Sequence, residues 1–142
     1  MNLAEASPLA LLAGIEAGRL SARAVFEGYL ERIERLEPAI GAFAWLDLAA
    51  ARAAHEGLSA RGPLRGLPVG VKDIFDTADM PTCLGSAIHA GRRPGRDAAV
   101  VSMVRRAGGA IVGKTTTTAF AYLDPTATRN PSMPLSLIHI SQ

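Results

Sequence analysis

Apolar residues near the start of the chain recur every three or four positions, as they do on one face of an α-helix. Ser7 followed by Pro8 is typical of a helix start, and Gly18 is typical of a helix end. Ser21 marks a second start, and Pro38 is expected to end that second helix. The apolar positions that carry the two helices are Leu9, Leu12, Ile15, Val25, Tyr29, Ile33 and Leu36.

The pattern changes to short apolar runs after the second predicted helix. Residues 40–46 predict a strand, and Asp47 is placed to cap a third helix that continues to about Ala60. Five glycines or prolines within residues 62–70 exclude a helix there. The valines that follow predict a strand near Lys72.

The second half of the chain repeats this alternation of turns, helix and strand. Residues 76–96 are rich in turn residues, and Asp97 is expected to cap a fourth helix that ends at Gly108 and Gly109. Residues 110–112 predict a buried strand. Helices that alternate with short apolar strands favour the α/β class, and the length of the chain favours one domain.

The composition mainly excludes classes of protein and of site. The chain has 142 residues, of which 49% are hydrophobic and 20% charged, as is typical of a folded globular protein. Its net charge of +2 is too small for a basic face, so no direct contact with nucleic acid is expected. A single cysteine, Cys83, excludes an internal disulfide and a multi-cysteine metal site. No apolar run reaches the roughly 18 to 20 residues of a membrane helix, and the N-terminus is unlike a secretory signal. We therefore expect a soluble cytoplasmic protein with no membrane partner.

One motif suggests a nucleotide-binding protein. Residues 108–115, Gly-Gly-Ala-Ile-Val-Gly-Lys-Thr, match the phosphate-binding loop pattern letter for letter. That loop needs a strand before its glycines and a helix after its lysine. Here a predicted helix precedes Gly108, and a predicted strand fills the middle of the motif, so that Lys114 follows a strand. A P-loop nucleotide binder is therefore disfavoured.

Only two of the 15 basic residues are lysines, Lys72 and Lys114. Lys72 lies among valines and glycines near a predicted strand end, where burial would remove water from its amine, and desolvation lowers the pKa of a lysine. A lysine of that kind can deprotonate a serine, as in the Ser–Lys variants of the catalytic triad. A surface lysine paired with a carboxylate fits the same residues, so physical chemistry alone leaves the function open at this point.

A series of short motifs runs from residue 62 to residue 131. Each motif is weak alone, but their order and spacing are specific, and together they resemble the N-terminal part of the amidase signature family. The two N-terminal helices and the segment 40–48 also fit the opening of that family, so the resemblance covers most of the chain. The matching stretches are 62–73 (Gly-Pro-Leu-Arg-Gly-Leu-Pro-Val-Gly-Val-Lys-Asp), 76–77, 80–82, 85–86, 97–99, 113–115, 120–121 and 128–131.

The resemblance implies an α/β fold in which helices cover a mixed β-sheet. It also implies an enzyme that hydrolyses an amide, or transfers its nitrogen, with a Ser–cis-Ser–Lys triad. Lys72 matches the triad lysine, the base that activates the nucleophilic serine through the cis-serine. Lys114 falls in a second lysine-containing motif of the family, and we interpret it as structural. The implied substrate is a small-molecule amide, and the implied chemistry needs no metal or organic cofactor.

The resemblance also implies residues that this sequence lacks. After the motif at 128–131 the family continues into a glycine- and serine-rich loop that carries the cis-serine, and the nucleophile comes later. This sequence has no Gly-Gly-Ser-Ser run. We therefore expect residues 1–131 to be the N-terminal portion of an amidase domain, with a helical lead-in over 1–61 and a lysine-bearing α/β segment over 62–131. Residues 132–142 are expected to be foreign to the fold, and the fragment by itself is expected to be inactive.

Other interpretations of the chain stay open. The parent protein could be the glutaminase subunit of a tRNA-dependent amidotransferase with partner subunits, or an amidase that forms a homodimer. The chain could also be a non-catalytic binding or interaction domain.

Several further side chains are weak candidates. Ser86 is a weak candidate for a substrate pocket, and a turn serine explains it equally well. Cys83 with His89 is a disfavoured nucleophile pair, and two ligands do not make a metal site. His55 is assigned no role, and the cluster of Arg92, Arg93 and Arg96 is expected to be a solvated loop.

Overall fold

The computed structural model describes residues 6–58 and 62–131, and it opens with two helices. Helix α1 (Pro8–Glu16) begins after Ser7, whose hydroxyl accepts the N–H of Ala10. Helix α2 (Ala22–Ile40) begins after Ser21, whose hydroxyl accepts the N–H of Ala24 in the same way. Both predicted N-caps are confirmed, because each serine oxygen satisfies an N–H that the first turn of a helix leaves unpaired.

The second helix does not end at Pro38, as predicted, but continues through it to Ile40. The proline lies in the last turn, where its missing N–H removes only one bond of the helix. Gly41 then ends the helix in the left-handed conformation, with φ of 63°. The carboxylate of Glu37 accepts the N–H groups of Ala42 and Phe43 and thereby directs the chain into the next strand. The strand predicted over 40–46 is consequently shorter, β1 (Phe43–Leu46).

The third helix, α3 (Leu48–Glu56), has the predicted cap. Asp47 accepts the N–H of Ala50 at 2.9 Å. The helix ends at Gly57 rather than near Ala60, and Ala60 lies outside the described residues.

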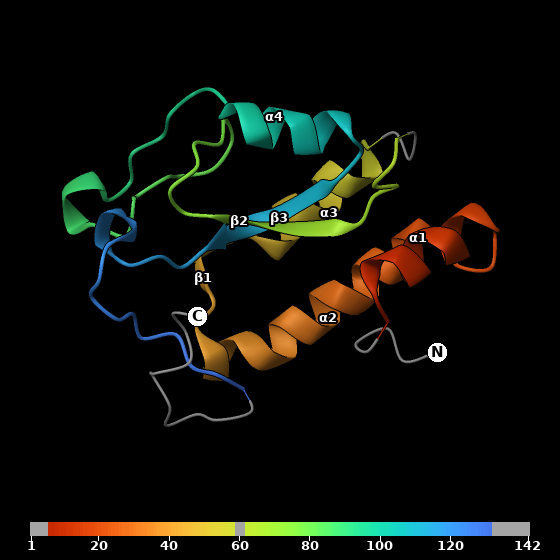
Figure 1. Ribbon diagram of the computed structural model, residues 1–142, viewed down its shortest axis with the longest axis horizontal. Coiled ribbons are helices and arrows are strands. Elements are labelled where there is room, and N and C mark those ends of the chain that lie inside the picture. Colours follow the sequence, from red (N-terminus) through yellow and green to blue (C-terminus); the bar gives the residue numbers. More distant parts are fainter. Residues whose placement is uncertain (1–5, 59–61, 132–142) are drawn as a thin grey trace.

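Three strands form one mixed sheet. Strand β3 (Ala110–Thr115) is central, with β1 antiparallel on one side and β2 (Pro68–Lys72) parallel on the other. The chain reaches β3 through helix α4 (Ala99–Arg106) and the turn at Gly108. Figure 1 shows α4 over one face of the sheet and α2 below the other, which confirms the predicted α/β class. Strand β3 is longer than the predicted 110–112, so Lys114 lies within the strand rather than after it.

Helix α4 does not have the predicted cap. Its N-cap residue is Ala98, which makes no side-chain cap bond. The carboxylate of Asp97 instead accepts the N–H of Ala78 at 2.7 Å and pairs with Arg105 at 3.0 Å. Asp97 therefore connects the helix to the preceding loop rather than to its own first turn. Two short 3-10 turns complete the described elements, η1 (Ala87–His89) and η2 (Ala119–Ala121).

The core has one cluster on each face of the sheet and a third between the first two helices. The cluster on the α2–α3 side contains Phe26, Leu30, Ala51, Ala110 and Val112. The cluster on the α4 side contains Val71, Met80, Val101 and Ile111. The cluster between α1, α2 and the start of β2 contains Leu11, Val25 and Leu67.

No helix among the described residues is long and apolar enough to cross a membrane.

The pairing of β3 is irregular in the middle of the strand. Ile111 lies opposite Val69 of β2, but the next paired residue of β2, Gly70, lies opposite Gly113, so β3 contains one extra residue. Simple alternation would place Lys114 on the same face as Val112. Its antiparallel partner is Trp45, which packs in the cluster on the α4 side, and directly paired side chains share a face. The bulge thus directs Lys114 toward α4 and the loop after β2.

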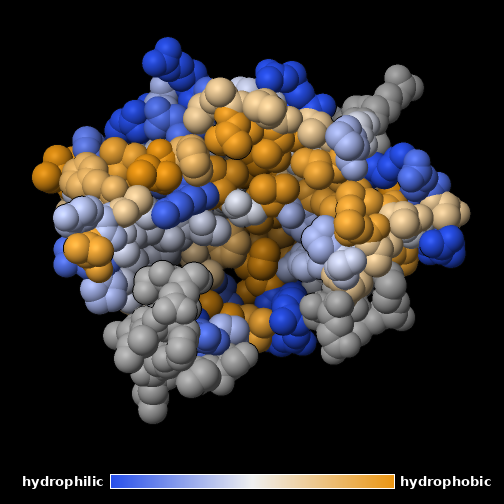
Figure 2. Space-filling model, viewed as in Figure 1, coloured by the Kyte–Doolittle hydropathy of each residue, from blue (hydrophilic) through white to orange (hydrophobic). Residues whose placement is uncertain are grey.

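An apolar groove of about 300 Å³ lies between the first two helices and the sheet. On the side of the molecule that Figure 2 shows, apolar side chains gather across the middle. The residues that line the groove are Pro8, Leu11, Tyr29, Ile33, Phe43, Leu67, Pro68, Gly70 and Val112.

Gly113 offers a test of the sheet. A Cβ at this position would lie 2.6 Å from the carbonyl oxygen of Trp45, so Gly113→Ala should separate β1 from β3 and lower the free energy of unfolding by about 1–3 kcal/mol. Gly57 is the matched control, because a Cβ there meets nothing closer than 3.8 Å. Gly57→Ala should be neutral or stabilise by about 0.4–1 kcal/mol. Urea unfolding midpoints measure both, and equal losses would contradict the close approach.

Candidate functional site

Lys72 is the last residue of β2, and its backbone is fixed on both sides. The N–H of Asp73 donates to the carbonyl of Thr115 at 2.9 Å, and the N–H of Phe75 donates to the carbonyl of Lys72 at 3.0 Å. The Lys72 side chain is exposed and has no hydrogen bond or ion pair with any described residue. No described residue buries Lys72, because the neighbouring Val71 and Asp73 point into the core and Lys72 points away from it, so its desolvation stays a prediction.

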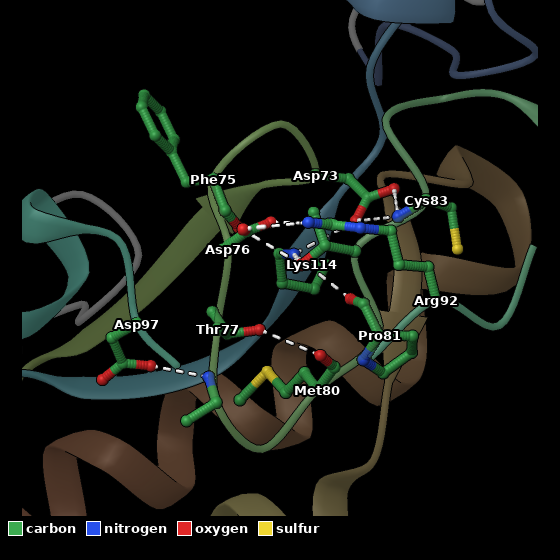
Figure 3. A network of polar contacts seen from close by, with 12 residues as sticks. Asp73, Phe75, Asp76, Thr77, Met80, Pro81, Cys83, Arg92, Asp97 and Lys114 are labelled. Atoms are coloured by element: carbon green, nitrogen blue, oxygen red, sulfur yellow. Dashed lines mark hydrogen bonds and ion pairs between the residues drawn. The ribbon is translucent and has the colours of Figure 1, made fainter. Parts of the chain in front are cut away.

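Lys114 is the lysine that the fold buries. Its side chain is 0% exposed, and its ammonium lies 3.1 Å from an oxygen of Asp73, which is itself 2% exposed. The same ammonium donates to the hydroxyl of Thr82 at 2.6 Å. It also donates to the carbonyl of Pro81 at 3.1 Å (Figure 3). The ammonium thus donates two hydrogen bonds and makes one ion pair, so three oxygens of the loop surround its charge. Lys114 is thus a buried cation whose charge is paired, which agrees with its interpretation as structural.

This arrangement excludes the P-loop interpretation. Gly108 joins a helix to a strand, and Lys114 lies inside the strand with its ammonium in an ion pair. A phosphate would need the lysine exposed beside a glycine loop at the start of a helix. Gly113 of the apparent motif instead serves the close approach of β1.

Asp73 joins the two ends of the loop that follows β2. Its carboxylate accepts the N–H of Cys83 at 3.1 Å, and its carbonyl accepts the N–H of Leu84 at 3.0 Å. One residue next to Lys72 therefore holds the end of the strand, the far end of the loop and the buried cation together.

The outer part of the same loop carries a second ion pair. Arg92 donates two hydrogen bonds to the carboxylate of Asp76, at 2.7 and 3.1 Å, and these bonds hold the pKa of Asp76 below its ordinary value. Arg93 donates to the carbonyl of Asp79. Two members of the arginine cluster, Arg92 and Arg93, thus bind the loop and are not only solvated.

A hollow of about 500 Å³ lies beside this loop, and Lys72 does not line it. The residues that line the hollow are Ile74, Phe75, Asp76, Leu84, Arg92, Arg96, Asp97 and Ala98.

The remaining candidates have local roles. Ser86 caps η1 by accepting the N–H of Ile88, as a turn serine does, and its role toward a substrate stays a prediction. The ring of His89 packs edge-on against Phe120, and no group of three His, Cys, Asp or Glu side chains in the described parts of the chain could hold a metal ion. His55 stacks on Phe26 with ring centroids 4.1 Å apart.

A scan against protein families matches the amidase model over residues 24–133. The chain belongs to the amidase family. A glutamyl-tRNA(Gln) amidotransferase subunit of Acidothermus cellulolyticus is 41% identical over 92% of this chain, and AmiD of Mycobacterium tuberculosis, a protein assigned as an amidase, is 41% identical over 84%. The solved peptide amidase of Stenotrophomonas maltophilia is similar over 91% of the chain, with 32% identity and a TM-score of 0.72.

This amidase-family chain spans only part of its relatives. The matched region covers 28% of the Acidothermus protein, 26% of AmiD and 28% of the peptide amidase structure. The fold predicted from the family motifs is nevertheless confirmed over nearly the whole of the chain.

Sequence reasoning missed two residues of the site, Asp73 and Thr82. Both lie within stretches that match family motifs, but a motif does not indicate which of its residues face inward. One signal was available: a carboxylate next to a lysine at a strand end must point to the opposite face, and a buried carboxylate needs a cation.

The two lysines should respond differently to the same substitution. Lys114→Met would leave the buried Asp73 without a cation, and we expect the free energy of unfolding to fall by about 3–5 kcal/mol. Lys72→Met changes an exposed side chain and should alter it by less than about 0.5 kcal/mol. Denaturant unfolding of the two variants measures the difference, and equal midpoints would contradict the burial of Lys114.

His55 should make stability depend on pH. Burial holds the pKa of His55 below its ordinary value of 6.5, although a hydrogen bond with the backbone of Gly66 opposes the shift. Below pH 6.5 the unfolded chain then binds more protons than the folded chain, so stability should fall as the pH drops from about 6.5. His55→Phe keeps the aromatic stack and should flatten this slope, whereas His89→Gln serves as the control. An unchanged slope in His55→Phe would refute the assignment.

Proposed function

We propose that Lys72 is the general base of an amide hydrolase that uses a Ser–cis-Ser–Lys triad. One observation carries this proposal. Of the two lysines, Lys114 is hydrogen-bonded and ion-paired in the core, whereas Lys72 projects from the end of a fixed strand with no partner among the described residues. Lys72 also occupies the lysine position of the family motif at 62–73. The exposure of its amine supports a partner outside the described residues.

The proposed chemistry moves one proton along the triad. The neutral amine of Lys72 accepts a proton from the cis-serine, which takes the proton of the nucleophilic serine as that oxygen attacks the amide carbonyl. The proton then passes to the leaving nitrogen as the C–N bond breaks, and an acyl-enzyme remains. Water hydrolyses the ester, or the released ammonia is transferred to a second substrate. The substrate class is a small-molecule amide.

We further propose that residues 1–131 are the lysine-bearing portion of the amidase domain and that residues 132–142 are foreign to it. Neither serine of the triad is assigned within this portion, and the sequence has no Gly-Gly-Ser-Ser run. The relatives are more than three times as long as the matched region, which supports a division of the triad between this portion and another. The 142-residue chain by itself should therefore not turn over amides.

A second candidate is the glutaminase subunit of a tRNA-dependent amidotransferase, which would work with partner subunits. The observation that favours it is the 41% identity over 92% of this chain to one subunit of such an enzyme. The two candidates differ in substrate, because the glutaminase should prefer glutamine and pass its ammonia to a partner.

The test begins with the coding DNA downstream of this sequence and with the longest protein that it encodes. Ammonia release from simple amides and from glutamine measures turnover. Lys72→Met should lower kcat by about 10²–10⁴-fold. Lys72→Arg should lower it equally, because a guanidinium keeps the charge but cannot accept a proton.

The controls separate a base from a charged residue. Arg23→Ala removes an exposed partner of Glu56 and should leave kcat unchanged. Retained turnover in Lys72→Arg would contradict the role of a base. Turnover by the isolated 142-residue chain would contradict the division of the triad, and binding of a ligand without any turnover would favour a non-catalytic domain.

A further inference from the structure

Two routes, one through an ion pair and one through hydrogen bonds, connect the buried Lys114 ammonium to the backbone of Lys72. The first runs through the carboxylate of Asp73, which directly follows Lys72 in the chain. The second runs through the hydroxyl of Thr82, which receives a hydrogen bond from Lys114 at 2.6 Å and donates to the carbonyl of Phe75 at 3.4 Å. The N–H of Phe75 in turn donates to the carbonyl of Lys72 at 3.0 Å. The cation therefore acts on both sides of the peptide that follows Lys72.

The arrangement is more demanding than stability alone requires. A buried ion pair often contributes no more to folding than apolar side chains of the same volume, because both charges lose their water. An apolar residue in place of Lys114 could fill the space, but it could not bind Asp73, Thr82 and Pro81 in three directions at once. Only a cation at this position can hold the loop around it in the observed geometry.

We propose that Lys114 is a positioning residue for Lys72. The Lys114 ammonium fixes the end of β2 through Asp73 and the following turn through Thr82 and Phe75, and it thereby fixes where the Lys72 amine points. This inference rests on the proposed function in one respect only, namely that Lys72 is the base whose direction matters. Lys114 itself touches no reacting atom in this proposal.

Two buried threonines of the same loop make a matched pair for the test. Thr82 and Thr77 are both 0% exposed, and each donates to a carbonyl of the loop. Only Thr82 also accepts from Lys114, whereas Thr77 donates to Met80 and has no hydrogen bond to either lysine. Thr82→Val and Thr77→Val therefore remove the same group at the same depth, and only the first interrupts the route to Lys72.

The readout uses the fact that the chain has only two lysines. When the 142-residue chain is labelled with ¹⁵N at lysine, the backbone amides give two cross-peaks that single substitutions assign. Thr82→Val should shift the Lys72 peak and raise amide hydrogen exchange at Phe75 by about tenfold. Thr77→Val should leave the Lys72 peak in place and Phe75 exchange within about twofold. Thr82→Ser keeps the hydroxyl and should restore the wild-type Lys72 peak.

Several outcomes would overturn the proposal. An unmoved Lys72 peak in folded Thr82→Val is one, and equal effects of Thr82→Val and Thr77→Val are another, since they would indicate general loosening. If Thr82→Val does not fold, Asp73→Asn takes its place, because it keeps the shape and an acceptor for Cys83 but removes the charge. A folded Asp73→Asn chain with an unmoved Lys72 peak would also refute positioning.

Turnover separates this inference from the proposed function. In the active longer protein, Thr82→Val should lower kcat by about tenfold at unchanged KM, and Thr82→Ser should restore it. Normal turnover in Lys72→Met would refute the proposed function, whereas the shift of the Lys72 peak would still show that Lys114 positions it. Loss of turnover in Lys72→Met together with wild-type turnover in Thr82→Val would refute positioning alone.

Discussion

A buried cation organises the end of β2 and the loop that follows it. The ammonium of Lys114 lies in the core, where it pairs with a carboxylate and donates hydrogen bonds to a hydroxyl and a carbonyl, all of which belong to the loop after β2. Removal of any one acceptor would leave part of a charge unpaired where water cannot reach it. These contacts hold the loop in its observed conformation and connect it to the strand end that precedes it.

The sheet makes this burial feasible. Strand β3 is central, so Lys114 has Trp45 of β1 on one side and Val71 of β2 on the other, and helices cover both faces of the sheet. The extra residue near Gly113 directs Lys114 to the α4 side, where the loop supplies acceptors, rather than to the apolar α2–α3 side. Gly113 also lets the backbone of β1 approach closely. The residues that match a nucleotide-binding loop are thus explained by the packing of the sheet: Gly113 lets β1 approach, and Lys114 is the buried cation.

Two lysines in a chain that otherwise uses arginine have opposite environments, and both environments call for lysine. Lys114 carries a compact ammonium at the end of a narrow side chain, and this ammonium fits among three oxygens of the loop. A planar guanidinium would not fit there. Lys72 must exchange a proton if it is the base, and an arginine cannot do so. Asp73 lies between the two roles, since it follows one lysine in sequence and binds the other in space.

The sequence by itself determined the class of fold, the caps at Ser7, Ser21 and Asp47, and membership of the amidase family, because helical periodicity, capping residues and motif order are local or linear properties. Tertiary structure alone decided which lysine is buried. Apolar neighbours favoured Lys72, but burial depends on the face that a side chain takes in the sheet and on the acceptors that distant residues bring to it. The bulge in β3 reverses that face, and the loop from residue 73 to residue 84 brings the acceptors. The spacing of apolar residues predicts neither the bulge nor the position of the loop, because both arise only when the strands pair.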